Sequence, residues 1–219
     1  DRYDVYEWYL DLGALSNVNA KYFHDKIPTW RDFVNHPDYD AFWQRQGFAP
    51  WLNRVTVPTL NVAGWWDQED FYGPIKIYEL LEQHDKANQN FLVVGPWNHG
   101  GWSRGEGRKL GNIDFGSPTA EHYRRNIMVP FLSHYLKGTK GHELPEALTF
   151  RTGANEWVRH DSWPPKRDVS PKRLHLHDRR RVSFDPPPNA AVQMFDSYIS
   201  DPANPVPYLP RPIELRVGW

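Results

Sequence analysis

The sequence predicts an α/β fold followed by a β-rich segment, and three patterns support this prediction. Two short apolar runs, at 57–64 and 91–95, each end at a glycine and have the length of buried strands. The stretch at 74–86, which lies between them, has helical periodicity. From about residue 146, short alternating runs are separated by clusters of Pro, Asn and Asp. That pattern is typical of a β-sandwich or jelly roll.

The two apolar runs and the helix between them form a βαβ unit. Strands that are joined through a helix lie parallel in one sheet. The helix at 74–86 places Ile75, Tyr78 and Leu81 on one face, and it has Pro74 in its first turn. Proline fits there because the first backbone N–H groups of a helix have no partner within the helix. We therefore expect a parallel sheet with this helix packed against it.

Helices are also expected on both sides of the βαβ unit. Residues 1–55 are aromatic and polar and predict short helices, one of them with Asp38 as its N-cap. A long amphipathic helix is expected over 119–137, kinked at Pro130 and ended by Gly138. After this helix the sequence pattern changes from helical periodicity to short alternating runs, which predicts a domain boundary there.

The composition is that of an ordered globular protein. Of the 219 residues, 39% are hydrophobic and 15% are aromatic, which argues against disorder. The 26 basic and 27 acidic residues give a formal net charge of −1, so we expect no nucleic-acid partner. No run approaches the length of a membrane span, so we expect no membrane partner. The chain has no cysteine, which excludes disulfides, thiol catalysis and cysteine-based zinc sites.

The stretch GPWNHGGWSRG, at 95–105, contains two candidate catalytic residues, Ser103 and His99. Ser103 lies in a G-x-S-x-G match, the spelling of a nucleophile elbow. An elbow needs a strand directly before the serine and a helix directly after it. Three glycines occur in the eight residues after Ser103, and they oppose a helix. We therefore interpret the serine match as coincidental.

His99 and Asp67 form a stronger pair. His99 follows the second predicted strand by four residues, and Asp67 follows Gly64, the end of the first, by three. The carboxyl ends of parallel strands meet at one edge of the sheet, where catalytic loops gather. A carboxylate that orients an imidazole is the acid–base part of a serine hydrolase triad. Taken separately, a turn-capping aspartate and a solvated loop histidine are the ordinary alternatives.

The residues around this pair carry a more specific signal. The sequence GWWDQEDFYG at 64–73, followed by GPWNH at 95–99, resembles the α-amino acid ester hydrolases. These belong to the wider family of cocaine-esterase-like (CocE/NonD) α/β-hydrolases and the related Xaa-Pro dipeptidyl-peptidases (S15). The resemblance continues over nearly the whole chain, through YRR at 123–125, TGANEW at 152–157, SWP at 162–164 and YISDPANPVPY at 198–208.

The resemblance implies a domain organisation and a set of site residues. Residues 1–55 would be the end of a helical cap, 56–140 the C-terminal part of an α/β-hydrolase domain, and 146–219 a partial jelly-roll domain of the galactose-binding type. Asp67 would be the triad acid and His99 the triad base. No cofactor and no metal are implied.

Substrate-binding candidates follow from the same resemblance. Relatives that prefer free α-amino groups hold the ammonium with acidic residues, and Asp40 lies near the cap's share of that cluster. A capping carboxylate on a short helix is the alternative role for Asp40. Glu69 and Asp70 are interpreted as negative charge near the start of the next helix. Trp66 and Trp102 are expected to line an apolar pocket.

The sequence departs from the family in one respect. The family's serine lies upstream of the cap in a G-x-S-Y-x-G elbow, whereas only Ser16 precedes Asp67 here, with no strand before it. We therefore expect the nucleophile to lie outside this sequence and the 219-residue chain alone to be inactive. The resemblance favours a periplasmic or secreted protein, and a homo-oligomer is possible.

The expected function is a serine hydrolase that cleaves esters or amides, including β-lactam acyl side chains, through an acyl-enzyme. Its partner would be a small-molecule ester or amide or a short peptide. Two alternatives stay open: an Xaa-Pro dipeptidyl-peptidase, and a non-catalytic fragment whose β-sandwich module binds sugar or a protein. His175 and His177 could ligate a metal, but no third ligand is nearby, so we interpret them as solvated strand residues.

Overall fold

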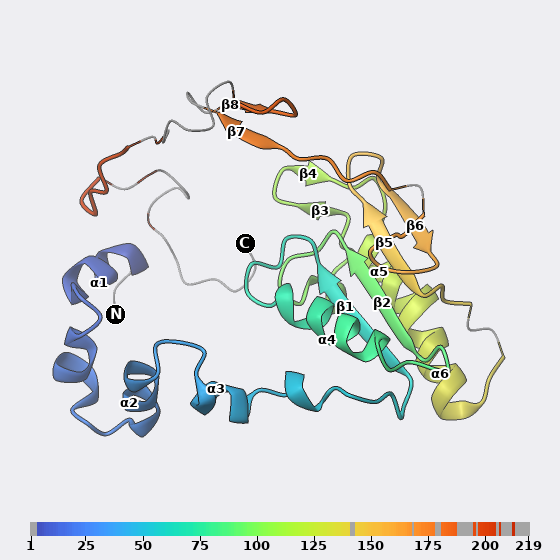
Figure 1. Cartoon of the computed structure of the whole chain (residues 1–219), viewed down its shortest axis with the longest axis horizontal. Coiled ribbons are helices and arrows are strands. Elements are labelled where there is room, and N and C mark those ends of the chain that lie inside the picture. The colour runs from blue at the N-terminus through green and yellow to red at the C-terminus, as the bar shows by residue number, and fades with distance from the viewer. Residues whose placement is uncertain are drawn as a thin grey trace. The chain divides into compact units, whose positions relative to one another are not determined.

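The computed structural model describes residues 4–140, 143–167, 169–177, 181–187, 195, 197–204, 206 and 212 (Figure 1). The chain divides into two compact units. One is built on residues 32–166 and contains the main sheet, and the other draws on residues before 32 and after 166.

The main sheet has four strands in the order β1-β2-β5-β6 (Figure 1). Strand β1 (Thr59–Gly64) pairs in parallel with β2 (Asn90–Gly95), and helix α4 (Tyr72–Glu82) connects them. The predicted α/β class and the predicted βαβ unit are therefore confirmed. Strand β5 (Ala147–Arg151) pairs in parallel with the other edge of β2, and β6 (Glu156–His160) pairs antiparallel with β5.

Strands β5 and β6 lie in a different sheet from the one that the sequence pattern predicts for them. Their short alternating pattern groups them with the β-rich segment, yet they extend the parallel sheet. Four of the five residues of β5 are buried, as expected of a strand covered on both faces. Alternation reports the local strand conformation, whereas the partner strand is selected by packing that is distant in sequence.

Apolar side chains cover both faces of the sheet. Leu92 and Val94 of β2 pack with Tyr78 of α4 on one face. Val93 points to the other face, where it packs with Tyr123 and Ile127. Because successive side chains of a strand alternate between faces, a strand buried on both faces is apolar throughout. The sheet is thus a fixed platform with helices on either side (Figure 1).

The long helix expected over 119–137 is present, with an irregular middle. It consists of α5 (Thr119–Tyr123), a π-helical turn η4 (Arg124–Met128) and α6 (Val129–Lys137). Pro130 has no N–H to donate to the preceding turn, and the π-helical turn ends two residues before it, at Met128. Gly138 ends the helix at a φ of 68°, with its N–H bonded to the His134 carbonyl.

The remaining elements are short. The helical ones are α1 (Val5–Leu12), the π-helical η1 (Asn19–Phe23), α2 (Pro28–Asn35), α3 (Ala41–Gln46) and the 3-10 turns η2 (Ala49–Trp51) and η3 (Gly101–Ser103). Two small hairpins pair β3 (Lys109–Leu110) with β4 (Ile113–Asp114), and β7 (His175–His177) with β8 (Arg181–Ser183). Asp40, rather than the expected Asp38, is the N-cap of α3.

A half-buried carboxyl group lies beside α4. The Tyr78 hydroxyl donates to Glu146 at 2.7 Å, and Asn90 donates to the neighbouring Glu82 at 3.1 Å. Burial, together with the nearby negative charges of Glu82 and Asp85, raises the pKa of Glu146 from its ordinary 4.5 to about 7. The folded protein therefore holds a proton here that the unfolded chain has already released at pH 6.

The raised pKa of Glu146 predicts a pH-dependent stability. Between pH 4.5 and 7 the folded state binds more protons than the unfolded state, so the free energy of unfolding falls as the pH rises. Allowing for solvent access, we expect a loss of about 1 kcal/mol, which Glu146→Gln should largely abolish. Urea unfolding at pH 5 and pH 7.5 measures it. Glu79→Gln, at a partly exposed residue of α4 that pairs with Lys76, is the control and should keep the wild-type slope.

Candidate active site

Asp67 lies just beyond the end of β1, in a turn that extends the parallel pairing. The N–H of Trp65 bonds to the Gly95 carbonyl at 2.9 Å, and the N–H of Trp66 bonds to the Trp97 carbonyl at 3.0 Å. The Asp67 side chain is 2% exposed. Its Oδ1 accepts the backbone N–H groups of Glu69 and Asp70, both at 3.0 Å. These two bonds fix the carboxylate in one orientation.

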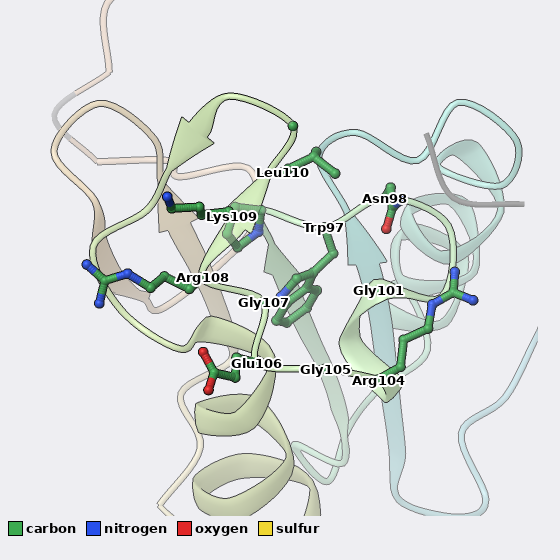
Figure 2. A pocket seen from close by; sticks show the side chains of 12 residues that line it. Trp97, Asn98, Gly101, Arg104, Gly105, Glu106, Gly107, Arg108, Lys109 and Leu110 are labelled. Carbon is green, nitrogen blue, oxygen red and sulfur yellow. The ribbon is translucent and has the colours of Figure 1, made fainter. Parts of the chain in front are cut away.

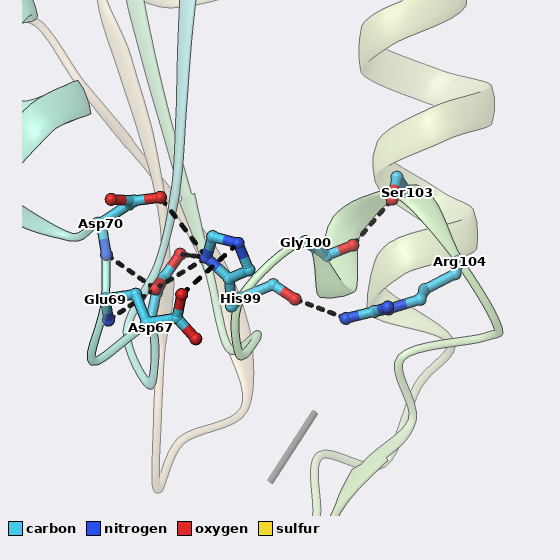
Figure 3. Close-up of polar contacts among 7 residues, drawn as sticks. All are labelled: Asp67, Glu69, Asp70, His99, Gly100, Ser103 and Arg104. Atoms are coloured by element: carbon cyan, nitrogen blue, oxygen red, sulfur yellow. Dashed lines mark hydrogen bonds and ion pairs between the residues drawn. The ribbon is translucent and has the colours of Figure 1, made fainter. Parts of the chain in front are cut away.

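His99 meets Asp67 at the carboxyl edge of the sheet (Figure 3). The imidazole Nδ1 lies 3.2 Å from Oδ2 and 3.3 Å from Oδ1 of Asp67. The predicted juxtaposition of these two side chains is therefore confirmed. The His99 side chain is 33% exposed, so the ring bridges a buried carboxylate and the solvent. A carboxylate at Nδ1 favours the tautomer with its proton on Nδ1, which leaves Nε2 able to accept a proton.

Two further carboxylates flank the same imidazole. Asp70 Oδ2 lies 3.6 Å from Nδ1 of His99, and Glu69 Oε2 lies 4.0 Å from Nε2 (Figure 3). Both side chains are more than half exposed. From the sequence, Glu69 and Asp70 are expected only to place negative charge near the start of a helix. Their signal was the run DQED itself, in which three acidic residues stand within four positions and two of them follow the expected triad acid.

Ser103 lies in a different local structure from a nucleophile elbow. It ends the 3-10 turn η3, and the residue after it, Arg104, is extended rather than helical. The exposed Ser103 hydroxyl donates to the Gly100 carbonyl at 2.8 Å (Figure 3). This geometry is consistent with the interpretation that the G-x-S-x-G match is coincidental.

The three proposed substrate-binding residues make contacts that stabilise the fold, namely ring packing and helix capping. Trp66 packs on Phe115 with ring centroids 5.5 Å apart, and Trp102 packs on Trp97 at 6.4 Å. Asp40 accepts the N–H of Phe42 as a helix cap. Its side chain also contacts His36, and this hydrogen bond lowers the pKa of Asp40. A role of Trp66, Trp102 or Asp40 in binding substrate stays a prediction.

Trp97 packs against the ends of β1 and β2 and bonds to the start of α5. It is 2% exposed, and its indole N–H donates to the Thr119 hydroxyl at 3.0 Å. A methyl group added at Gly95 would lie 2.4 Å from the indole ring. One added at Gly64 would lie 2.3 Å from the Trp97 carbonyl. Glycine at the end of each strand thus allows the tryptophan to pass close to the sheet.

A cavity of about 820 Å³ adjoins the loop after His99 and is lined by Trp97 and the segment 104–111. Figure 2 shows the Trp97 indole within this loop, with the charged groups of Arg108 and Lys109 pointing away from it. Both of these cations pair with Asp114, at 3.3 Å and 3.9 Å. The inner wall is therefore the indole and glycine-rich backbone, and the charges lie at the rim.

Within the part of the chain that the structure describes, no cluster of three or more His, Cys, Asp or Glu side chains could hold a metal ion. Among the same described residues, no helix combines the length and the apolar character that spanning a membrane requires.

A parallel sheet that presents a buried carboxylate and an imidazole from adjacent strand ends is an arrangement typical of hydrolases. Comparison with known proteins agrees. Residues 2–101 match the family model of the X-Pro dipeptidyl-peptidases (S15 family). Cocaine esterase of Rhodococcus sp. (strain MB1 Bresler) is 30% identical over 184 residues, which are 80% of this chain and 31% of the esterase.

Two solved structures are similar over almost the whole chain. An aminopeptidase from a marine sediment Thaumarchaeota archaeon aligns with a TM-score of 0.86 and 41% identity, covering 98% of this chain and 35% of that one. An α-amino acid ester hydrolase aligns with a TM-score of 0.84 and 34% identity, covering 96% and 35%. These matches support the assignment of the chain to the CocE/NonD and S15 family of hydrolases. It spans about a third of the length of these relatives.

The close approach of Trp97 to the sheet predicts a sharp sensitivity at Gly95. Gly95→Ala forces the new methyl group into the indole ring, so we expect a loss of about 1–3 kcal/mol in the free energy of unfolding. Gly73→Ala is the matched control, because nothing lies within 4 Å of its new methyl group. Gly73 is in helix α4, where alanine should stabilise by up to about 1 kcal/mol. Urea unfolding of both variants measures the difference, and equal effects would contradict the packing argument.

Proposed function

We propose that the protein carrying this chain is a serine hydrolase for esters or amides of acyl groups with a free α-amino group. One observation carries the proposal: the buried Asp67 carboxylate lies within hydrogen-bonding distance of Nδ1 of His99 at the carboxyl edge of the sheet. Asp67 is the triad acid, and His99 is the triad base. The family assignment supports the class of reaction.

Each residue then has a defined task. Asp67 holds the imidazole in the tautomer that leaves Nε2 free, and it stabilises the imidazolium once His99 has accepted a proton. His99 takes the proton of an attacking serine hydroxyl and returns it to the leaving group. The acyl group passes through a covalent acyl-enzyme, which water hydrolyses. The serine is supplied from outside this sequence.

The preference for a free α-amino group rests on the charges around His99. Glu69 and Asp70 place two carboxylates within 4.0 Å of the imidazole, and both are open to solvent. An ammonium group next to the reacting carbonyl would be held by these carboxylates through charge-assisted hydrogen bonds. The names of two similar solved structures, an aminopeptidase and an α-amino acid ester hydrolase, agree with this substrate class. Cleavage of β-lactam acyl side chains falls within the same class.

The domain organisation is part of the proposal. Residues 1–55 form the end of a helical cap, and residues 56–140 form the C-terminal part of an α/β-hydrolase domain. Of residues 146–219, β5 and β6 extend the hydrolase sheet, and a partial jelly roll follows them. Support comes from the extent of the alignment, which covers 96% of this chain in the ester hydrolase.

Peptide cleavage is the second candidate function. The match of residues 2–101 to the X-Pro dipeptidyl-peptidases and the 41% identity to an archaeal aminopeptidase favour a peptide substrate. The acidic side chains near His99 suit either bond, because a peptide with a free N-terminus and an α-amino ester both present an ammonium group. Comparing turnover of α-amino esters with that of dipeptidyl and aminoacyl amides separates the two.

The proposed triad predicts a large loss of turnover. In the complete protein, His99→Ala should lower kcat by at least about 1,000-fold, and Asp67→Asn should lower it by about 10,000-fold, since an amide favours the wrong tautomer. Glu79→Gln, which removes a carboxylate of α4 that pairs with Lys76, is the control and should stay within a few-fold. Steady-state hydrolysis of an α-amino ester measures all three. If the His99→Ala variant kept turnover within a few-fold of wild type, the assignment of His99 as the triad base would be wrong.

A labelling experiment checks the position of the nucleophile. The 219-residue chain, treated with a fluorophosphonate, should carry no label at Ser103, because that hydroxyl bonds to the Gly100 carbonyl instead of to His99. Mass spectrometry of the digested chain reads the result. A phosphonylated Ser103 would make the G-x-S-x-G match functional and would overturn our interpretation of it.

Recognition of the ammonium predicts a charge-dependent substrate preference. Glu69→Gln combined with Asp70→Asn should lower kcat/KM for an α-amino ester by about 10-fold or more, the size of a lost charge-assisted hydrogen bond. The N-acetylated ester carries no ammonium and should change less than threefold. Glu79→Gln in α4 is the control for a carboxylate removed elsewhere. Equal losses for both esters would argue for a general disturbance of His99 instead.

A further inference from the structure

The loop that carries His99 has little regular structure to hold it. Between the end of β2 and the small strand β3, only the three-residue turn η3 interrupts it. Gly100 adopts a φ of 69°, so the chain reverses directly after the histidine. Backbone bonds within the loop are short-range, from Gly101 N–H to the Asn98 carbonyl and from Ser103 N–H to the Gly100 carbonyl. Something outside the loop must therefore fix its position.

Arg104 ties the far end of this loop back to the histidine. A guanidinium nitrogen of Arg104 donates to the backbone carbonyl of His99 (Figure 3). The same side chain lies over Gly100, where an added Cβ would be 3.7 Å from it. Arg104 thus closes the turn that presents the imidazole to Asp67.

Arg124 holds the segment on either side of Arg104. Its Nη1 donates to the Trp102 carbonyl at 3.1 Å, and its Nη2 donates to the Gly105 carbonyl at 2.6 Å. The two carbonyls are three residues apart, and Arg104 lies between them. A guanidinium can bind two acceptors at once because its donors form a rigid fork.

The helix that carries Arg124 is itself fixed to the core. Arg124 is the first residue of the π-helical turn η4, directly after Tyr123, which is 3% exposed. At the start of α5, the Thr119 hydroxyl donates to the Gly107 carbonyl at 2.6 Å and accepts the indole N–H of Trp97. Single-turn π-helical segments frequently occur at functional sites. Arg124 therefore extends from a rigid support into the loop of His99.

We propose that Arg124 is a positioning residue for His99 and acts through Arg104. This inference rests on the proposed role of His99 as the triad base. By fixing the carbonyls of residues 102 and 105, Arg124 sets the backbone of Arg104, whose guanidinium then fixes the carbonyl of His99. The Asp67 carboxylate alone leaves the ring free to pivot, because it bonds only at Nδ1. The backbone restraint holds the main chain of His99 in the position from which Nδ1 contacts Asp67.

The test uses the 219-residue chain and needs no turnover. The variants are Arg124→Met and Arg124→Lys, and the matched control is Arg125→Met, which removes the next arginine of the same turn. Arg125 is 76% exposed and pairs only with Glu121 among the contacts described. Two signals are followed by NMR: the imidazole Nδ1–H proton of His99, and amide hydrogen exchange across residues 100–105.

For Arg124→Met we expect amide exchange at 100–105 to accelerate at least tenfold and the Nδ1–H signal to broaden or vanish. Exchange in β1 and β2 should stay within twofold, which shows an intact sheet. Arg124→Lys should restore little, because one ammonium cannot replace the two-pronged contact, and Arg125→Met should match wild type. Faster exchange with an unchanged Nδ1–H signal would overturn the proposal, since the loop would then be loosened without moving His99. Because no step uses substrate, this result is independent of whether the protein proves to be a hydrolase.

Discussion

The in-register parallel pairing of β1 with β2 is the constraint on which the candidate site depends. It sets Gly64 opposite Gly95, and two more backbone bonds carry the pairing into the turns that follow. The backbone pairing by itself therefore brings the Asp67 carboxylate and the His99 ring together at this edge of the sheet. A slip of one residue would turn alternate side chains to the other face and separate the pair.

The two halves of the site are held in different ways. Asp67 is buried and is oriented by two N–H groups of its own turn. His99 is partly exposed and lies on a loop whose carbonyls are bound by arginine side chains. Trp97 joins the halves, because its carbonyl accepts from the Asp67 turn while its indole bonds to the helix behind the loop. A fixed carboxylate combined with a restrained imidazole suits a base that must accept and release a proton.

The charge around His99 gives the site its chemical character. The chain as a whole is close to neutral, yet three carboxylates gather within 4.0 Å of one imidazole. The cavity beside the loop has an aromatic and backbone wall with its cations at the rim. The chain spans about a third of the length of its relatives, and within it the described charges around the imidazole come from the turn after β1.

The sequence by itself determined the βαβ unit, the long helix ending at Gly138, and the pairing of Asp67 with His99, because these follow from local periodicity and from the end of each strand. It also carried the family resemblance. It placed the N-cap of α3 at Asp38 and gave capping only as an alternative role of Asp40, because two aspartates within three positions can serve as one cap. Only the tertiary structure decided that β5 joins β2, that Glu69 and Asp70 reach the imidazole, and that Arg124 binds the loop of His99. Those contacts join residues through packing and through side-chain directions that no periodic pattern encodes.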